Sequence, residues 1–341
     1  MDIISMKQDF YKRFDESDSY LYQQSCGLLC TLLGFPNITG ALSITYPLSV
    51  GVKGLCRSAA SDKLELESTD SDEVFSHRIH SEKSFLPKDK RIFGGQILID
   101  NSIPKYFDST AEVKCCTLKC VLSFNELDDY DKVAAAASCC GKENIKPYLA
   151  LLNARQGYCI KSDRLKAEAL PLPLSGFKII LIQLDKKETK TEDIKEIENE
   201  VKRIKTHMPH ITAMSELNRA DLETLRPHIR SKSVYRRLIH IINDNERIRR
   251  VSESLRGCRT SELFNQMNMS AKDFLKLWGL EKQEAMLLQN VLETEGVRAA
   301  RFWNRGVAAI AYEERVDYIL SAVENAFKHR GGYEIKFCVA K

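Results

Sequence analysis

The chain carries no excess of charge of one sign, no apolar run long enough to span a bilayer, and no internal repeat or low-complexity tract. Its 51 basic and 47 acidic residues nearly cancel, so no overall electric field would attract nucleic acid or a membrane surface. No charged segment followed by an apolar core is found near residue 1, which argues against a secretion signal. We therefore expect a cytoplasmic protein that binds neither nucleic acid nor membrane.

The sequence also lacks any Cys-x-x-Cys pair, although it contains 11 cysteines. In a protein without a secretion signal, these cysteines are expected to be reduced thiols. Five of them fall in one mixed-apolar segment, at Cys115, Cys116, Cys120, Cys139 and Cys140. The step from Cys116 to Cys120 is a helical spacing, so we interpret this group as small buried side chains and predict no metal site.

With 341 residues, 43% of them hydrophobic, the chain is long enough for a sizeable core or for two ordinary domains. Short runs of alternating or continuous apolar residues predict strands near 49–57, 63–68, 73–79, 96–103, 157–161, 177–184, 297–303, 306–312 and 334–339. The run 177–184 is apolar almost throughout, which predicts a strand in the middle of a sheet. Helical periodicity predicts helices near 6–33, 108–152, 192–206 and 236–256, with others ending near 294 and 330.

Local signals mark the ends and faces of two of these helices. Asp108 or Ser109 can cap the block that follows, and Glu112 is placed to reach back to it, as in a capping box. The helix near 236–256 has one apolar stripe and ends at Gly257. Its arginines are interleaved with acidic residues and spread around the helix, so we favour a solvated face over a phosphate-binding surface.

The stretch Gly34–Thr45, which reads Gly-Phe-Pro-Asn-Ile-Thr-Gly-Ala-Leu-Ser-Ile-Thr, organises the rest of the chain. Its two glycines, with an Asn between them, predict a tightly turning backbone that approaches another group closely. The stretch resembles the galactokinase signature Gly-Arg-Val-Asn-Leu-Ile-Gly-Glu-His-Thr-Asp-Tyr without a gap, with Gly34, Asn37 and Gly40 on the family's Gly, Asn and Gly. The family's Arg, Glu, His and sugar-binding Asp fall instead on Phe35, Ala41, Leu42 and Ile44.

Similarity to the galactokinases extends over almost the whole chain. It includes the segments 47–50, 170–173, 242–248, 263–268 and 296–301, in the order and spacing of the family. The chain therefore resembles the galactokinase, homoserine kinase and mevalonate kinase superfamily. This resemblance implies a two-layer α/β fold with two domains, in which sugar and ATP meet in a cleft between them. We place the domains at residues 1–170 and 171–341.

Two glycine-rich motifs of the family are also altered. The loop that holds the ATP phosphates corresponds to residues 104–112, where Ser109 and Thr110 remain but the glycines do not. The later motif corresponds to residues 300–306, where Gly306 survives and Trp303 adds bulk. These residues are remnants of sites, and we expect no nucleotide to be held by them.

The family's catalytic Asp corresponds to Lys146 or Pro147, depending on a shift of register by one residue. Neither side chain can accept a proton from a sugar hydroxyl or orient it. We therefore predict a pseudokinase, with no catalytic residue and no cofactor, that keeps the fold for ligand binding, regulation or assembly. The alternative is an active sugar kinase that uses ATP and Mg²⁺ in a rebuilt site, for which Asp108 and Glu143 are the nearby carboxylates.

Basic residues replace acidic or small ones around the former site, while its sugar side becomes apolar. We predict that an anion-binding site for a small amphipathic anion, or for an acidic segment of a partner protein, is formed by Lys105, Lys146, Arg301 and Arg305. The other interpretation is that the apolar residues fill an abandoned cavity and the lysines point to solvent.

Overall fold

The computed structural model describes residues 1–14, 20–59, 63–69, 93–140, 144–184, 192–208, 210–229, 231–328 and 334–340. The chain divides into two compact units. Unit 1 comprises Met1–Leu29 and Pro47–Ala154, and unit 2 comprises Cys30–Tyr46 and Arg155–Lys341. The boundary that we placed between residues 170 and 171 lies within strand β6 (Lys166–Pro171) of unit 2. The strand predicted at 73–79 and the carboxylate of Glu143 lie outside the described residues.

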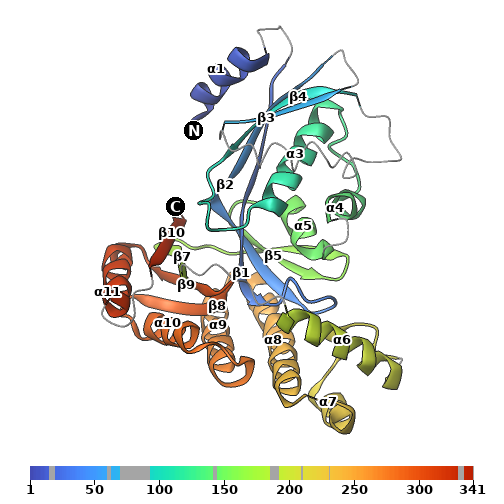
Figure 1. Ribbon diagram of the computed structural model, residues 1–341, viewed down its shortest axis with the longest axis vertical. Helices are drawn as coiled ribbons and strands as arrows, with labels where there is room; N and C mark the ends of the chain where they lie inside the picture. Colours follow the sequence, from blue (N-terminus) through green and yellow to red (C-terminus); the bar gives the residue numbers. More distant parts are fainter. Residues whose placement is uncertain are drawn as a thin grey trace. The chain divides into compact units, whose positions relative to one another are not determined.

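Unit 1 is a sheet with helices on its two faces (Figure 1). Its strands are β3 (Leu64–Ser68), β4 (Gly95–Asn101) and most of β1 (Tyr22–Gly34) and β2 (Ser43–Ser58), whose residues within Cys30–Tyr46 belong to unit 2. β4 lies between β3 and β2, and β1 pairs with β2. On one face, helix α1 (Ile3–Phe14) packs its apolar residues against Leu55 and Leu98. Helix α3 (Thr110–Phe124) covers Gly54 on the opposite face, and α4 (Lys132–Cys140) and α5 (Ile145–Leu152) pack beside it.

The helix predicted over 6–33 is therefore correct only for α1, because residues 22–34 form strand β1. Buried Cys26, Leu28 and Cys30 alternate with less buried neighbours, which is the period of a strand. Leu21, Leu28 and Leu32 are also compatible with a helical period, so the spacing of leucines alone led to the wrong element.

Unit 2 is built on an antiparallel sheet in the order β10-β7-β9-β8. These strands are β7 (Phe177–Leu184), β8 (Val297–Trp303), β9 (Gly306–Tyr312) and β10 (Ile335–Ala340). β7 pairs with a neighbour on each side, which confirms the prediction of a strand in the middle of a sheet. A separate hairpin of β5 (Tyr158–Asp163) and β6 pairs with the first residues of β2.

Helices complete unit 2 (Figure 1). They are α6 (Glu192–His207), α7 (Arg219–Leu225), α8 (Lys232–Arg256), α9 (Ser261–Asp273), α10 (Lys282–Glu293) and α11 (Val316–Lys328). α9 and α10 pack on β8, α11 packs on β10, and α6 and α7 pack on α8. The mixed α/β fold that the resemblance implied is confirmed.

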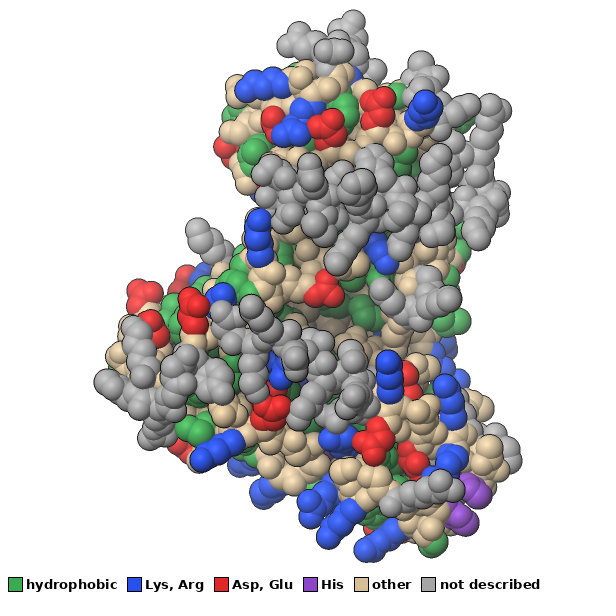
Figure 2. Space-filling view, viewed as in Figure 1, with side chains coloured by type: hydrophobic (Ala, Val, Ile, Leu, Met, Phe, Trp, Pro, Cys, Tyr) green, Lys and Arg blue, Asp and Glu red, His purple; other side chains and the backbone are tan. Residues whose placement is uncertain are grey.

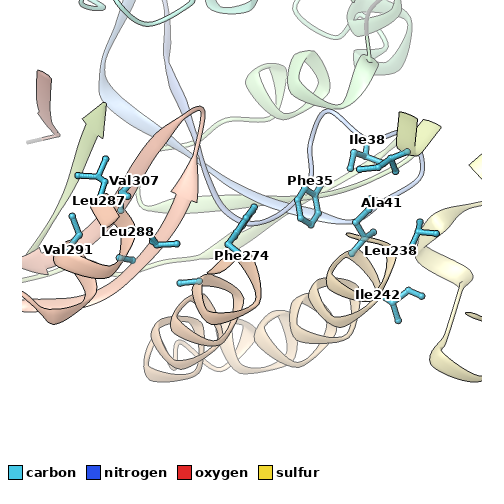
Figure 3. Close-up of a cluster of buried hydrophobic side chains, with 14 of the residues drawn as sticks. Phe35, Ile38, Ala41, Leu238, Ile242, Phe274, Leu287, Leu288, Val291 and Val307 are labelled. Carbon is cyan, nitrogen blue, oxygen red and sulfur yellow. The ribbon is translucent and has the colours of Figure 1, made fainter. Parts of the chain in front are cut away.

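The core of unit 2 joins the stretch after β1 to the helices (Figure 3). Phe35, Ile38 and Ala41 lie in one apolar cluster with Leu238 and Ile242 of α8. The predicted apolar stripe of that helix is confirmed, since all of its members are buried: Val234, Leu238, Ile241, Ile248, Val251 and Leu255. These apolar residues of the signature stretch are thus part of the core, whereas Asn37 and Thr39 are exposed.

The arginines of α8 divide into two groups. Arg236, Arg249, Arg250 and Arg256 are exposed, as a solvated face requires. Arg237 and Arg247, by contrast, are buried and form ion pairs with Glu196 and Asp244. Figure 2 shows basic and acidic side chains interspersed on the visible face of this helical region. No helix of the described residues is both long enough and apolar enough to cross a membrane.

Candidate functional site

The residues from Gly34 to Leu42 form a closed loop between β1 and β2. Gly34 has a φ of +74°, and a Cβ added to it would lie 2.1 Å from the Leu42 carbonyl oxygen. Gly40 has a φ of +76°. The Phe35 N–H donates to the Leu42 carbonyl at 3.0 Å and closes the loop. The predicted tight turn and close approach are confirmed, and both positions require glycine.

Helix α8 holds both ends of this loop through two successive side chains. An Asp244 oxygen accepts a hydrogen bond from the Gly34 N–H at 3.3 Å, and the Asn245 side-chain oxygen accepts one from the Leu42 N–H at 2.9 Å. The Asn245 amide also donates to the Met214 carbonyl at 2.9 Å. The backbone N–H groups at both ends of the loop are therefore satisfied by the protein itself, which holds the ends of the loop in place.

Asp244 is the centre of a buried ionic network. Its carboxylate is fully buried and has four side-chain partners: Arg247 at 2.8 Å, Ser270 at 2.9 Å, Arg301 at 3.4 Å and His240 at 3.5 Å. Burial by itself would raise the pKa of Asp244, but His240, Arg301 and Arg247 outweigh burial and leave that pKa below its ordinary value. Asp244 is therefore ionised and serves as the anchor of the loop.

The charges of this network balance without a bound ligand. Arg247 bridges Asp244 and Asp273, which lies 2.7 Å away, and Arg301 joins Asp244 to the Gly34 carbonyl. Two carboxylates thus face two guanidinium groups. Since a buried charge must be paired to be tolerated, each member of the network depends on the others.

Apolar side chains occupy the four positions of the signature stretch that the resemblance matches to the family's Arg, Glu, His and Asp. Phe35 is 8% exposed, Ala41 0%, Leu42 3% and Ile44 0%. The Phe35 ring stacks on Trp278, with 4.7 Å between the centroids and 11° between the planes, and the Arg301 guanidinium lies 5.3 Å from its centroid. Phe35 is therefore fixed between an aromatic ring and a buried cation.

The four basic residues predicted to bind an anion differ in environment. In unit 2, Arg301 is 2% exposed and pairs with Asp244, and Arg305 pairs with Glu284 at 3.6 Å. In unit 1, Lys105 is exposed and Lys146 of α5 is 1% exposed. Anion binding by this set stays a prediction, and at Arg301 or Arg305 an anion would have to displace a carboxylate.

Comparison with known proteins gives a consistent relationship. A curated galactokinase of Clostridium perfringens (strain SM101 / Type A) is 28% identical over 185 residues, which cover 51% of this chain and 47% of the relative. A galactokinase of Fusobacterium nucleatum is 24% identical over 283 residues, or 76% of this chain and 72% of the relative. The chain thus matches about half the length of its clostridial relatives. No family model matches it.

Among solved structures, Lactococcus lactis galactokinase complexed with galactose has a TM-score of 0.80 at 18% identity, covering 99% of this chain and 97% of that one. The mevalonate kinase of L. major in complex with R-mevalonate has a TM-score of 0.61 at 13% identity, covering 95% and 97%. The chain is thus similar in sequence to galactokinases and shares their fold. The fold described above is the one that the Lactococcus lactis galactokinase shares with the mevalonate kinase.

Residues 104–112, which the resemblance matches to the phosphate loop of galactokinases, include a turn that uses its own polar groups. One Asp108 oxygen accepts hydrogen bonds from the Thr110 N–H at 3.0 Å and from its hydroxyl at 2.7 Å. Ser109 precedes α3 but makes no capping hydrogen bond, and its hydroxyl accepts from Asn101 at 3.0 Å. The predicted capping box is wrong, because the Glu112 carboxylate instead accepts a hydrogen bond from a backbone N–H of β1.

Residues 300–306, which the resemblance matches to the later glycine-rich motif, include a two-residue hairpin turn between β8 and β9. Asn304 and Arg305 have φ values of +44° and +65°, the left-handed conformation that such turns require at both central positions. Gly306 has another role, because a Cβ there would lie 2.0 Å from the Ile182 carbonyl oxygen of β7. The surviving glycine therefore allows the close approach of two paired strands.

Sequence reasoning missed the network around Asp244. Segment 242–248 was noted only for its similarity to galactokinases, and α8 was described by its apolar stripe. Three successive polar residues, Asn243, Asp244 and Asn245, all lie buried in the middle of that helix. Such a run within a long amphipathic helix is the signal by which the buried polar site can be found from the sequence.

Proposed function

We propose that this chain, which resembles galactokinases, is a pseudokinase that has lost phosphoryl transfer to galactose and keeps the fold for ligand binding, regulation or assembly. The observation that carries the proposal is the burial of apolar side chains where the motif match puts the family's polar groups. These positions are Phe35, Ala41, Leu42 and Ile44, and none is more than 8% exposed.

Burial matters because water cannot enter the core to take the place of a lost polar group. A lost polar group on an open surface can be substituted by water or by a nearby side chain. A position inside the core cannot be substituted in this way, since Phe35 is stacked on Trp278 and Ala41 lies in the apolar cluster of unit 2. Groups that stabilise charge in a transition state are each worth about 2–4 kcal/mol, so the loss of several removes most catalysis.

The position of the catalytic Asp supports the same proposal. It corresponds to Lys146 or Pro147, both in the first turn of α5, where Asn144 caps the helix by accepting a hydrogen bond from the Lys146 N–H at 3.1 Å. A protonated lysine cannot accept a proton from a sugar hydroxyl, and proline has no polar side chain. The residues at this position therefore begin a helix and provide no group that could act as the catalytic base.

The decisive experiment is an assay of the purified protein with ATP, Mg²⁺ and galactose, read by direct detection of galactose 1-phosphate. We expect turnover no faster than in buffer, with Lactococcus lactis galactokinase as the positive control. Leu42→His should also be inactive, because catalytic groups act as a unit. Stoichiometric product from the unmodified protein would overturn the proposal and favour an active kinase with a rebuilt site.

The same preparation tests ligand binding by thermal shift with ATP, galactose, galactose 1-phosphate and small organic anions. Bulky Tyr106 and Phe107, whose ring centroids are 4.7 Å apart, occupy the former phosphate loop, so we expect ATP to bind with a Kd weaker than about 10 μM. Stabilisation by an organic anion that is lost in Lys105→Ala, but kept in the exposed control Lys232→Ala, would support an anion site.

A further inference from the structure

Two exposed histidines lie face to face on the surface of unit 2. His207 is the last residue of α6, and His228 is the last residue of the 3-10 helix η3 (Arg226–His228), which follows α7. Their ring centroids are 4.2 Å apart, and the ring planes differ by 22°. Figure 2 shows histidine side chains gathered at the surface in the region of α6 and α7. The ends of two separate elements thus bring two imidazoles into contact.

The core of unit 2 sets the separation of these two histidines. α6 and α7 both pack on α8, and η3 continues directly from α7. Ile197 of α6 and Leu225 of α7 lie in the same apolar cluster as Leu238 of α8. The backbone at each histidine is therefore tied to packed helices, so the pair is held together before any ligand binds.

The surroundings of the pair are compatible with a bound cation. His207 ends a helix of 16 residues, and the C-terminal end of a helix carries a partial negative charge. Arg203 on the same helix pairs with Glu200 at 3.3 Å. Arg226 of η3 pairs with Glu223 at 3.6 Å. Since a carboxylate compensates each of these arginines, their repulsion of a metal ion beside the rings is reduced.

We propose that His207 and His228 form a binding site for a divalent transition-metal ion such as Zn²⁺. Imidazole nitrogen is a preferred ligand of zinc, copper and nickel, and histidine is the commonest protein ligand of metals. No group of three or more potential ligands that could hold a metal is found among the residues that the structure describes. The protein therefore supplies two ligands, and water fills the other positions.

Binding requires rotation of the exposed rings. For tetrahedral Zn²⁺ with Zn–N bonds of about 2.0–2.1 Å, the two nitrogen atoms lie about 3.4 Å apart. Stacked rings with centroids 4.2 Å apart are already close to this separation, but their nitrogen atoms do not point to a common centre. Each ring must turn about its Cβ–Cγ bond. That torsion is broad in histidine, and both side chains are exposed, so the rotation meets little resistance.

The bound ion joins parts of unit 2 that are otherwise linked through α8. One ligand ends α6, and the other ends the segment that contains α7. An ion that binds the folded protein and not the unfolded chain stabilises the fold. Zn²⁺ should therefore raise the urea midpoint of unfolding of unit 2. Tryptophan fluorescence measures this shift, because both tryptophans lie in unit 2.

The test is calorimetric titration of Zn²⁺ into full-length protein carrying Cys258→Ser, which removes the one exposed thiol among the eleven cysteines. The protein is first treated with EDTA, and the chelator is then removed. We expect His207→Ala and His228→Ala each to weaken binding at least tenfold, and the double variant to weaken it little further. His210→Ala, at an exposed histidine three residues beyond His207, is the matched control and should change the Kd less than twofold.

A second measurement uses the same protein without a change at either histidine. Diethyl pyrocarbonate modifies accessible imidazoles, and mass spectrometry of peptides gives the rate at each histidine. Saturating Zn²⁺ should slow modification of His207 and His228 at least tenfold and leave His210 unchanged. Absence of zinc binding, equal affinity in the two single variants and the parent protein, or protection of other histidines without these two would overturn the proposal.

Discussion

Two buried carboxylates, one in each unit, have opposite electrostatic environments. Burial would raise the pKa of Asp244 in unit 2, but His240 and two arginines reverse that effect and lower it. Glu112 in unit 1 is 4% exposed and accepts a hydrogen bond from the Leu29 N–H at 3.0 Å. Burial dominates there and raises the pKa of Glu112 to about 7. The same kind of group is thus a permanent charge in one unit and a titrating group in the other.

The difference shows what buried charge does in each unit. Asp244 organises its surroundings, because two arginines, a histidine and the Gly34 N–H converge on it. Glu112 makes one backbone contact with β1 in the same unit. Ionisation therefore favours the folded state at Asp244 and opposes it at Glu112, and three substitutions test this contrast.

Asp244→Ala should have the largest effect, a loss of about 3–5 kcal/mol in the free energy of unfolding, because Arg301 and Arg247 would remain buried without their shared carboxylate. Both tryptophans of the chain, Trp278 and Trp303, lie in unit 2, so tryptophan fluorescence during urea unfolding reports on this unit. Glu253→Gln, an exposed change on the same helix, is the control and should alter stability by less than about 0.5 kcal/mol. Equal effects of the two would show that the network contributes little.

Glu112→Gln should change the pH dependence of stability. The pKa of Glu112 is about 7 in the folded protein against an ordinary 4.5, so between these pH values the folded state keeps a proton that the unfolded chain has lost. Stability from this group is therefore complete below about pH 4.5 and is lost as the pH rises through about 7. As the pH rises from 4.5 to 8, the free energy of unfolding of Glu112→Gln should increase by about 3 kcal/mol relative to that of the unmodified protein.

Urea unfolding followed by far-UV circular dichroism at both pH values measures this gain. Asp129→Asn removes an exposed carboxylate of the same unit and should leave the pH profile unchanged. Parallel profiles for Glu112→Gln and the unmodified protein would mean that Glu112 titrates normally in the folded state.

Asn245→Ala should have the smallest effect of the three, about 1–3 kcal/mol, because it leaves the Leu42 N–H and the Met214 carbonyl without their partner but leaves no buried charge. Tryptophan fluorescence is again the measurement. A loss as large as that of Asp244→Ala would show that loop docking, rather than charge pairing, accounts for both effects.

Regular elements were predictable where one apolar period was unambiguous. The continuous apolar run of β7 and the stripe on α8 were located correctly, because burial on two sides or on one stripe leaves a clear pattern. Strand β1 was mistaken for a helix because its leucines fit both periods. Glu112 was assigned to a local cap, whereas its partner Leu29 is 83 residues away.

The candidate site was predictable only in part, for the same reason. The two glycines of the signature stretch reveal their left-handed backbone from local sequence alone. The polar network depends on contacts among Gly34, Asp244, Ser270 and Arg301, which no local pattern connects. The sequence can indicate that Arg301 is unusual for its motif. It does not identify the partner, Asp244, because the two residues meet only when β8 and α8 pack together.

The long sequence separation of these contacts determines when the signature loop can form during synthesis. Gly34 is 210 residues from Asp244 and 267 from Arg301. A ribosome must therefore release both α8 and β8 before the loop can acquire its final hydrogen bonds. Until then, Phe35 and its apolar neighbours have no core to enter, and the nascent chain exposes them as a target for chaperones.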